Sequence, residues 1–238
     1  MALPRLNNDQ PIYELTIPST KKKAKYRPFL VKEQKGLLIA LESRDPKQIL
    51  TSILQSIDTC IQDVDSSKLS TFDIDYIFTQ IRGKSVGEKT KLSGKCTECE
   101  HEKEIEINLT EIDMSFEPMD NVIPLNDDIK VKMKYPTYID MMEHSDILFA
   151  ENLNNTDQLY TSIKMCLESV QTKEENIDLK EESTEEIDGF MNSLNNDQLT
   201  EITKYVTNMP SLSHTVTWKC EKCEHENTLN LNGIQDFF

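Results

Sequence analysis

Two Cys-x-x-Cys units constrain the fold of this chain more than any other feature of its sequence. The first is Cys-Thr-Glu-Cys at residues 96–99, and the second is Cys-Glu-Lys-Cys at residues 220–223. Each follows a lysine and precedes Glu-His-Glu and an alternating apolar stretch that contains Asn-Leu. These shared flanks predict two hairpins of the same kind, each a strand, a tight turn and a strand. Each hairpin would form one half of a zinc ribbon.

The number of cysteines in each unit indicates that the two units work together. One unit supplies two thiolates, whereas structural zinc normally takes four ligands in a tetrahedron. We therefore expect one structural Zn²⁺ per chain, shared by Cys96, Cys99, Cys220 and Cys223. The intervening residues 100–219 form a far longer gap than the roughly 12–20 residues usual between such pairs. The competing interpretations are a redox motif, which belongs at a helix start rather than between strands, and two turns without metal.

Two histidines at equivalent positions leave a further alternative open. His101 and His225 each follow their second cysteine by two residues. If both were ligands, two separate sites of two cysteines and one histidine would form, each with an open position as in catalytic zinc. Otherwise each histidine packs beside its turn or donates to a sulfur. The other two cysteines, Cys60 and Cys166, lie on apolar helical faces and are predicted to be core residues.

The charge of the chain is large and unevenly distributed. The 238 residues carry a net charge of −16, yet residues 1–47 hold ten Lys and Arg against five acids. The rest of the chain therefore carries −21. Such an acidic chain repels phosphate backbones, which disfavours general nucleic-acid binding. The lysine-rich residues 21–25 are either a solvated loop or a docking patch for an acidic partner.

The compartment follows from what the sequence lacks. No apolar run approaches the roughly 20 residues that cross a bilayer, and the first ten residues lack the apolar core of a secretory signal. We therefore expect synthesis in the cytosol. A reducing compartment favours metal binding over a disulfide at Cys-x-x-Cys.

Apolar periodicity predicts an α+β fold with a small N-terminal β element, a helical core and a zinc ribbon. Strands are predicted at residues 13–17, 22–29, 85–92, 129–135 and 212–218. Helices are predicted at residues 31–43, 46–64, 71–83, 138–150, 158–170, 185–194 and 198–209. The predicted domains are residues 1–95 (N-terminal β element and helical core), residues 96–111 with 211–238 (the two ribbon halves), and residues 112–210 (an acidic, mainly helical insertion).

The sequence contains no motif that indicates catalysis. Arg-Gly-Lys-Ser at residues 82–85 has the ending of a phosphate-binding loop, but that loop needs a glycine where this chain has Phe78. The acidic residues of the chain are dispersed over predicted helical faces, so no catalytic carboxylate pair is identified. The prediction is a protein that is not an enzyme.

Six strings occur in an order that resembles a known family. They are Pro-Ser-Thr at 18–20, Tyr-Arg-Pro-Phe-Leu-Val-Lys-Glu at 26–33, Leu-Ile-Ala-Leu-Glu-Ser at 38–43, Phe-Asp-Ile-Asp-Tyr-Ile-Phe at 72–78, Arg-Gly-Lys-Ser-Val-Gly-Glu at 82–88, and the first cysteine pair. With these strings the sequence resembles the baseplate hub assembly proteins of T-even-type contractile-tailed bacteriophages. The resemblance is close over residues 10–110 and looser beyond.

The resemblance implies a non-enzymatic role in building the central hub of the phage tail baseplate. The protein would be a chaperone-like assembly factor, a hub component, or both, with other hub and tail proteins as its partners. It would act in the host cytoplasm during assembly and, as a hub component, remain in the virion. The resemblance is also compatible with an oligomer of this chain. Residues 27–30 and 73–88 are the expected positions of partner contact or fold nucleation, the alternative being plain core and turn.

Two other functional classes share some of these sequence features. A zinc ribbon is also typical of nucleic-acid-binding regulators, and residues 21–27 offer some basic surface, but the acidity of the chain argues against that function. An enzyme with a zinc-structured domain would require His101 or His225 to bind metal beside an open position.

Overall fold

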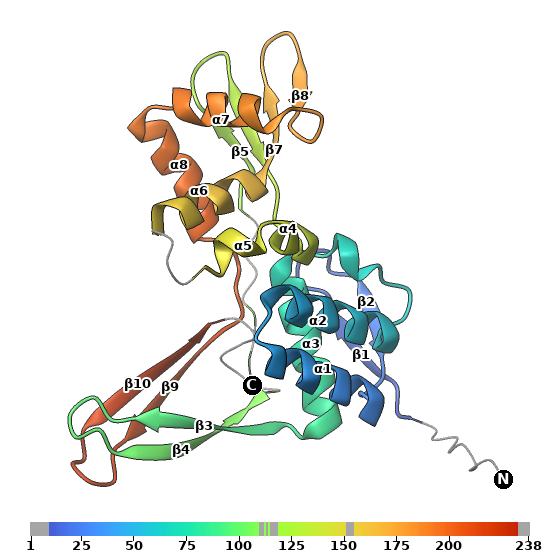
Figure 1. Ribbon diagram of the computed structural model, residues 1–238, viewed down its shortest axis with the longest axis vertical. Coiled ribbons are helices and arrows are strands. Elements are labelled where there is room, and N and C mark those ends of the chain that lie inside the picture. The colour runs from blue at the N-terminus through green and yellow to red at the C-terminus, as the bar shows by residue number, and fades with distance from the viewer. Residues whose placement is uncertain (1–9, 110–111, 113, 115–118, 151–154, 233–238) are drawn as a thin grey trace, which may run out of the picture. The chain divides into compact units, whose positions relative to one another are not determined.

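The computed structural model describes residues 10–109, 112, 114, 119–150 and 155–232 (Figure 1). Within these residues it contains eight α-helices and ten short strands, a mixed α/β fold with small sheets. Contacts divide the chain into two compact units. The first comprises Met1–Ser66, Phe72–Ser115 and Ser211–Phe238, and the second comprises Ser67–Thr71 and Phe116–Pro210. None of the helices in the described ranges has the length and apolar character needed to span a membrane.

The first unit begins with a small hairpin and a set of packed helices. Strands β1 (Tyr13–Thr16) and β2 (Lys23–Tyr26) pair antiparallel. Helices α1 (Val31–Ser43), α2 (Pro46–Cys60) and α3 (Thr71–Val86) follow. Asp45 caps α2 by accepting a hydrogen bond from the backbone N–H of Lys47 at 2.9 Å. The core of these helices is rich in isoleucine, and Ile57, Ile74, Ile77 and Ile81 are fully buried.

The strings that carry the family resemblance contact one another in this unit. The backbone N–H of Ser19 donates to the carboxylate of Asp73, which is fully buried, at 2.9 Å. The backbone N–H of Phe29 donates to the hydroxyl of Ser85 at 2.7 Å, and its ring lies 5.5 Å from that of Phe78. These contacts tie distant strings together, so both 27–30 and 73–88 have a structural role.

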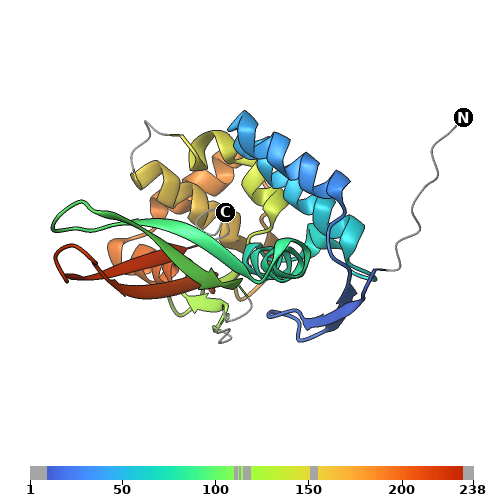
Figure 2. The same cartoon turned by 90° about the horizontal axis from the view of Figure 1, so that it is seen from below.

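Two further hairpins complete the first unit. Strands β3 (Lys89–Lys95) and β4 (Glu102–Asn108) form one, and strands β9 (Ser213–Lys219) and β10 (Glu226–Asn232) form the other. Both are antiparallel, and in each the last pair before the turn joins a lysine to a glutamate. Figure 2 shows them lying side by side with their turns at the same end. Segments more than 100 residues apart in the sequence thus lie beside each other.

The second unit is built on a four-stranded antiparallel sheet in the order β5-β6-β7-β8. Its strands are β5 (Val122–Pro124), β6 (Lys130–Met133), β7 (Leu167–Gln171) and β8 (Asn176–Asp178). Its helices are α4 (Tyr138–Glu143), α5 (Ser145–Leu148), α6 (Asn155–Cys166), α7 (Thr184–Ser193) and α8 (Asn196–Thr207). Side chains of α6, α7 and α8 share one apolar core with β6 and β7, in which Val131, Met133, Ile163 and Ile202 are fully buried.

Several predicted elements differ from those observed. The helix predicted to run to residue 170 ends at Cys166, where β7 begins, and β8 was not predicted at all. The helix predicted over 138–150 is divided at His144. Helix α3 passes through Gly83 and stops before Gly87, whose φ of 135° is readily adopted only by glycine. Short apolar runs fit a helix or a buried strand equally well, and only sheet pairing distinguishes them.

Candidate metal centre

The two Cys-x-x-Cys turns have the same backbone geometry. In the first, the N–H of Cys96 donates to the carbonyl of His101 at 2.9 Å, and the N–H of Glu100 donates to the carbonyl of Cys96 at 3.0 Å. Glu100 has a φ of 56°, in the left-handed region that tight turns require. The second turn repeats both bonds at 2.9 and 3.0 Å through the equivalent residues Cys220, Glu224 and His225. The shared sequence therefore encodes one local structure twice.

The four thiols of the two turns meet at one point. All four sulfur atoms lie within 4.8 Å of one another. The Sγ atoms of Cys96 and Cys223 are 3.6 Å apart, and those of Cys99 and Cys220 are 3.5 Å apart. Sulfurs in a tetrahedron with metal–sulfur bonds of about 2.3 Å are separated by about 3.8 Å. The arrangement therefore fits one tetrahedral metal ion shared by the two hairpins.

The other candidate ligands lie outside this group. Among the described residues, the cluster that could hold a metal contains the four cysteines and neither His101 nor His225. The sulfurs form one group rather than two. Burial raises the pKa of Cys60 to about 11 and that of Cys166 to about 12. Both are buried thiols that stay protonated at neutral pH, as expected of core residues.

The environment of the first hairpin favours a thiolate at Cys96. Burial opposes ionisation, since Cys96 is 1% exposed. The backbone N–H groups of Cys99 and Glu98 and the side chain of Asn227 outweigh that effect and lower the pKa of Cys96 to about 6. Hydrogen bonds to a charged sulfur thus prepare the ligand for a cation.

In the second hairpin the pKa of one cysteine is lowered and that of the other is raised. The pKa of Cys220 is lowered because backbone N–H groups of Cys223 and Lys222 outweigh the cost of burial. The backbone N–H of His225 also favours a thiolate at Cys223, but the surrounding thiols raise the pKa of Cys223 to about 12. Like charges this close cannot all ionise without a cation, and a divalent cation removes that repulsion.

A buried asparagine joins the two halves beside the sulfurs. Asn227, on β10, is 5% exposed. Its Nδ2 donates to the Cys96 Sγ at 3.5 Å and to the carbonyl of His225 at 3.1 Å. Its Oδ1 accepts from the backbone N–H of Thr97 at 3.0 Å and from the Thr97 hydroxyl at 3.2 Å. One side chain therefore holds a ligand sulfur, its own turn and the opposite turn.

The equivalent position of the first hairpin makes a different link. Lys103, like Asn227, lies seven residues after the first cysteine of its unit. Its ammonium lies 2.7 Å from the carboxylate of Glu221, which is the counterpart of Thr97. Sequence reasoning missed both links. Position-by-position comparison of the two units was the signal that could have found them.

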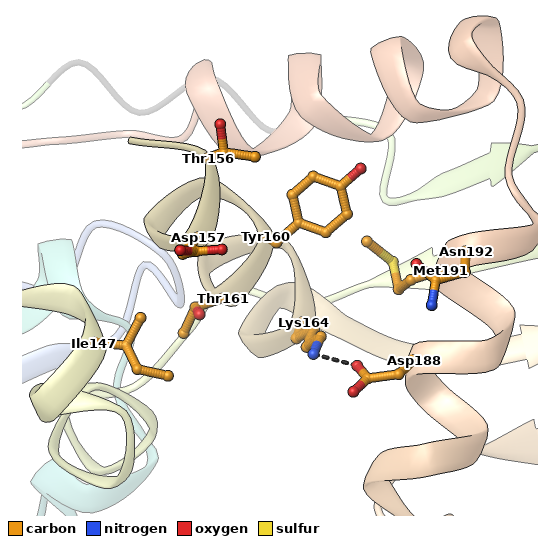
Figure 3. A pocket seen from close by; sticks show the side chains of 9 residues that line it. All are labelled: Ile147, Thr156, Asp157, Tyr160, Thr161, Lys164, Asp188, Met191 and Asn192. Carbon is orange, nitrogen blue, oxygen red and sulfur yellow. Dashed lines mark ion pairs between the residues drawn. The ribbon is translucent and has the colours of Figure 1, made fainter. Parts of the chain in front are cut away.

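A cavity of about 550 Å³ lies in the second unit (Figure 3). It is lined by Ile147, Thr156, Asp157, Tyr160, Thr161, Lys164, Asp188, Met191 and Asn192. Its one lysine forms an ion pair with Asp188 between α6 and α7. Its lining contains neither histidine nor cysteine. The four-thiol group remains the candidate site.

The fold and this site define a mixed α/β protein in which four converging cysteines could hold a metal ion. Residues 10–238 match the family model described as T4 bacteriophage base plate protein, so the chain belongs to that family. No curated protein and no solved structure matches it. Family membership confirms the predicted baseplate resemblance and gives the chain a structural role in the phage tail, among other baseplate proteins.

Proposed function

We propose that this protein is a non-enzymatic assembly factor or component of the baseplate hub, in which one structural zinc joins two distant hairpins. The observation that carries the zinc proposal is the convergence of four sulfurs, from residues 96–99 and 220–223, within 4.8 Å. Family membership supports the baseplate role. The metal would maintain the shape that other tail proteins recognise.

Zinc suits this set of ligands better than other common metals. Four thiolates in a tetrahedron are typical of Zn²⁺ or of iron–sulfur sites, whereas magnesium, calcium and manganese prefer oxygen ligands. Four protein ligands also leave no position for a reactive water, so the site would be structural rather than catalytic. This supports the proposal of a protein that is not an enzyme.

The hairpins themselves explain why a metal would be needed. Isolated two-stranded hairpins are at best marginally stable in water, and both of these are two-stranded. Structural zinc contributes about 10–16 kcal/mol in small peptides, comparable to the total stability of a domain at about 5–15 kcal/mol. One ion would therefore fasten both ends of the long segment between the cysteine pairs to the first unit.

The partners in this proposal are other proteins of the hub and tail, bound through surfaces away from the metal. Assembly would take place in the host cytoplasm, and a hub component would then remain in the virion. The net charge of −16 supports protein partners over nucleic acid, because an acidic chain repels phosphate backbones.

Metal analysis of the purified full-length chain tests the zinc proposal. We expect one zinc per chain, with four thiols becoming reactive when a chelator removes it. The matched pair of variants is Cys223→Ser, which should lose the metal, and Cys60→Ala, which should keep it. A metal-free protein with four freely reactive thiols would refute the proposal, and one iron per chain would refute zinc alone.

Assembly during infection tests the hub role separately. Phage that lack this protein should accumulate incomplete baseplates, and wild-type protein supplied in the host should restore them. Normal hubs in its absence would contradict the proposed role, whatever the metal content.

A further inference from the structure

Helix α1 carries an apolar stripe that its own unit leaves exposed. Of the eight large apolar side chains that are exposed in the described part of the chain, four lie on α1. Three of these, Val31, Leu38 and Leu41, lie within about 80° of one another around the helix axis, at about 100° per residue. The side chains that α1 buries, Glu33 and Ala40, lie on another side. So dense a group of exposed apolar side chains on one 13-residue helix indicates an interaction surface.

Two side chains of opposite charge border this stripe. Lys35 and Glu42 are both exposed. Because they are seven residues apart, they lie on the same side of the helix, next to Leu38. The other two charged residues of α1 are engaged with each other, since the ammonium of Lys32 lies 3.4 Å from the carboxylate of Glu33. The stripe is therefore bordered by one cation in the first half of α1 and one anion near its end.

The balance of charge favours a second copy of this chain as the occupant of the stripe. Helix α1 contains two lysines and two glutamates, and residues 31–47 contain four cations and three acids, a net charge of +1. The whole chain carries −16. Two copies with that charge repel each other, so they meet most readily through a face with little net charge. A strongly acidic or strongly basic partner would gain little net attraction from the same face.

The order of these residues along α1 matches an antiparallel pair of helices related by a two-fold axis. In such an interface residue i contacts residue j of the second copy, and j contacts i. Because the two helices run in opposite directions, a register that places Leu38 against Leu41 of the second copy also brings Lys35 within reach of Glu42 of that copy. A parallel pair would place each lysine level with the other lysine, which repulsion between like charges opposes.

We propose that this protein forms a dimer through α1, in which the α1 helices of two copies pack antiparallel across a two-fold axis. Leu38 and Leu41 of both copies form the apolar centre, and two ion pairs between Lys35 and Glu42 flank it. One helix face buries less than the roughly 800 Å² per partner of a standard interface, so the expected Kd lies between about 1 µM and 1 mM. The four clustered cysteines lie on other elements, and the dimer does not depend on a metal there.

Sedimentation equilibrium of the purified full-length protein, at concentrations up to about 1 mM, tests for the dimer. Wild type should dimerise, and Leu38→Glu should weaken the Kd about tenfold or more. Because Leu38 is 53% exposed, this variant should keep the wild-type Tm. The control is Val86→Glu, the same change at a residue that is 55% exposed on α3, and it should dimerise as wild type does. A wild-type chain that stays monomeric, or Leu38→Glu with the wild-type Kd, would overturn the proposal.

Charge reversal tests the antiparallel arrangement. Lys35→Glu places like charges opposite each other in both ion pairs, and so does Glu42→Lys, so each variant alone should dimerise about tenfold more weakly. An equimolar mixture of the two variants, or the double variant, should restore the wild-type Kd, because each pair again joins opposite charges. Lys180→Glu on the second unit is the control. Unchanged single variants, or no recovery in the mixture, would overturn the arrangement. Metal content should stay the same throughout, so this test is independent of the zinc proposal.

Discussion

The two cysteine hairpins have turns of the same structure, but the side chain that each uses to contact the other hairpin is different. Seven residues after its first cysteine, the second hairpin has Asn227, buried and bonded to a sulfur and to Thr97. The first has Lys103, which pairs with Glu221 at the surface. A buried, fully bonded polar group is costly to disturb, whereas an exposed ion pair contributes little. The repeated motif therefore gives the two hairpins the same turn, whereas the residues that link one hairpin to the other differ.

The same asymmetry occurs two residues before each first cysteine. The first hairpin has Gly94 there, and the second has Trp218. The Trp218 ring would lie 3.2 Å from a Cβ atom at position 94. A large side chain in one half therefore packs against the space left by its counterpart in the other. Two identical halves would be unable to interlock in this way.

The largest predicted effect follows the loss of a ligand, which should affect both hairpins at once. Cys223→Ser should abolish stoichiometric metal binding and loosen residues 211–232, because the two hairpins would lose the proposed ion that joins them. Limited proteolysis should cut the variant within these residues, while α2 stays protected. The control is Cys60→Ala, which leaves all four ligands in place. Equal cleavage of Cys223→Ser and wild type would break the view that the metal joins the halves.

A smaller effect separates the two linking side chains. Asn227→Ala should weaken zinc affinity by about 10–100-fold, as losses of groups bonded to metal ligands usually do. Lys103→Ala should change it far less, because it removes an ion pair with a half-exposed lysine worth at most about 1 kcal/mol. Competition with a coloured chelator measures both. Equal losses in the two variants would show that the halves are equivalent after all.

The pH dependence should report the same difference. A thiolate binds metal and a thiol does not, so affinity is present above the pKa of the ligands and falls as pH falls. The bond from Asn227 helps to lower the pKa of Cys96. Asn227→Ala should therefore release zinc at a higher pH than wild type, whereas Lys103→Ala should release it at the wild-type pH. A release midpoint that neither variant moves would contradict this role of Asn227.

Substitutions at two glycines should change the stability of the protein in opposite directions. At Gly94, a Cβ would lie 2.4 Å from the Cδ1 of Ile105 and 3.2 Å from the Trp218 ring, so Gly94→Ala should destabilise the protein by about 1–3 kcal/mol. At Gly189 in α7 nothing lies within 4 Å, so Gly189→Ala should stabilise by about 0.5–1 kcal/mol. Chemical denaturation gives both values. Stabilisation by Gly94→Ala would refute the interlocked packing of the hairpins.

The predictable parts of the fold were those whose signal is local. Helix α1 was predicted with its observed bounds, and the start of α2 follows from Asp45 and Pro46, which act within one turn. The cysteine hairpins were predictable because each turn is formed by six consecutive residues. Strand β7 was missed because Leu167–Gln171 extends an apolar helical pattern, and only its pairing with β6 and β8 makes it a strand.

The candidate site also has a part that was predictable from the sequence and a part that was not. The four cysteines were evident from their spacing, whereas Asn227 and Lys103 were ordinary polar residues of alternating strands until the hairpins were placed together. The exposure of Leu38 and Leu41 on α1 likewise became apparent only with the tertiary structure.

The sequence by itself determined the repeated turn, the identity of the four thiols, the acidic balance of the chain and its family strings, because each follows from the order or number of residues and not from which segments contact one another. Only the tertiary structure decided that the thiols form one group, that Asn227 bridges the halves and that Trp218 lies against Gly94. Those contacts join residues more than 120 positions apart, and they exist only once burial and strand pairing bring the segments together.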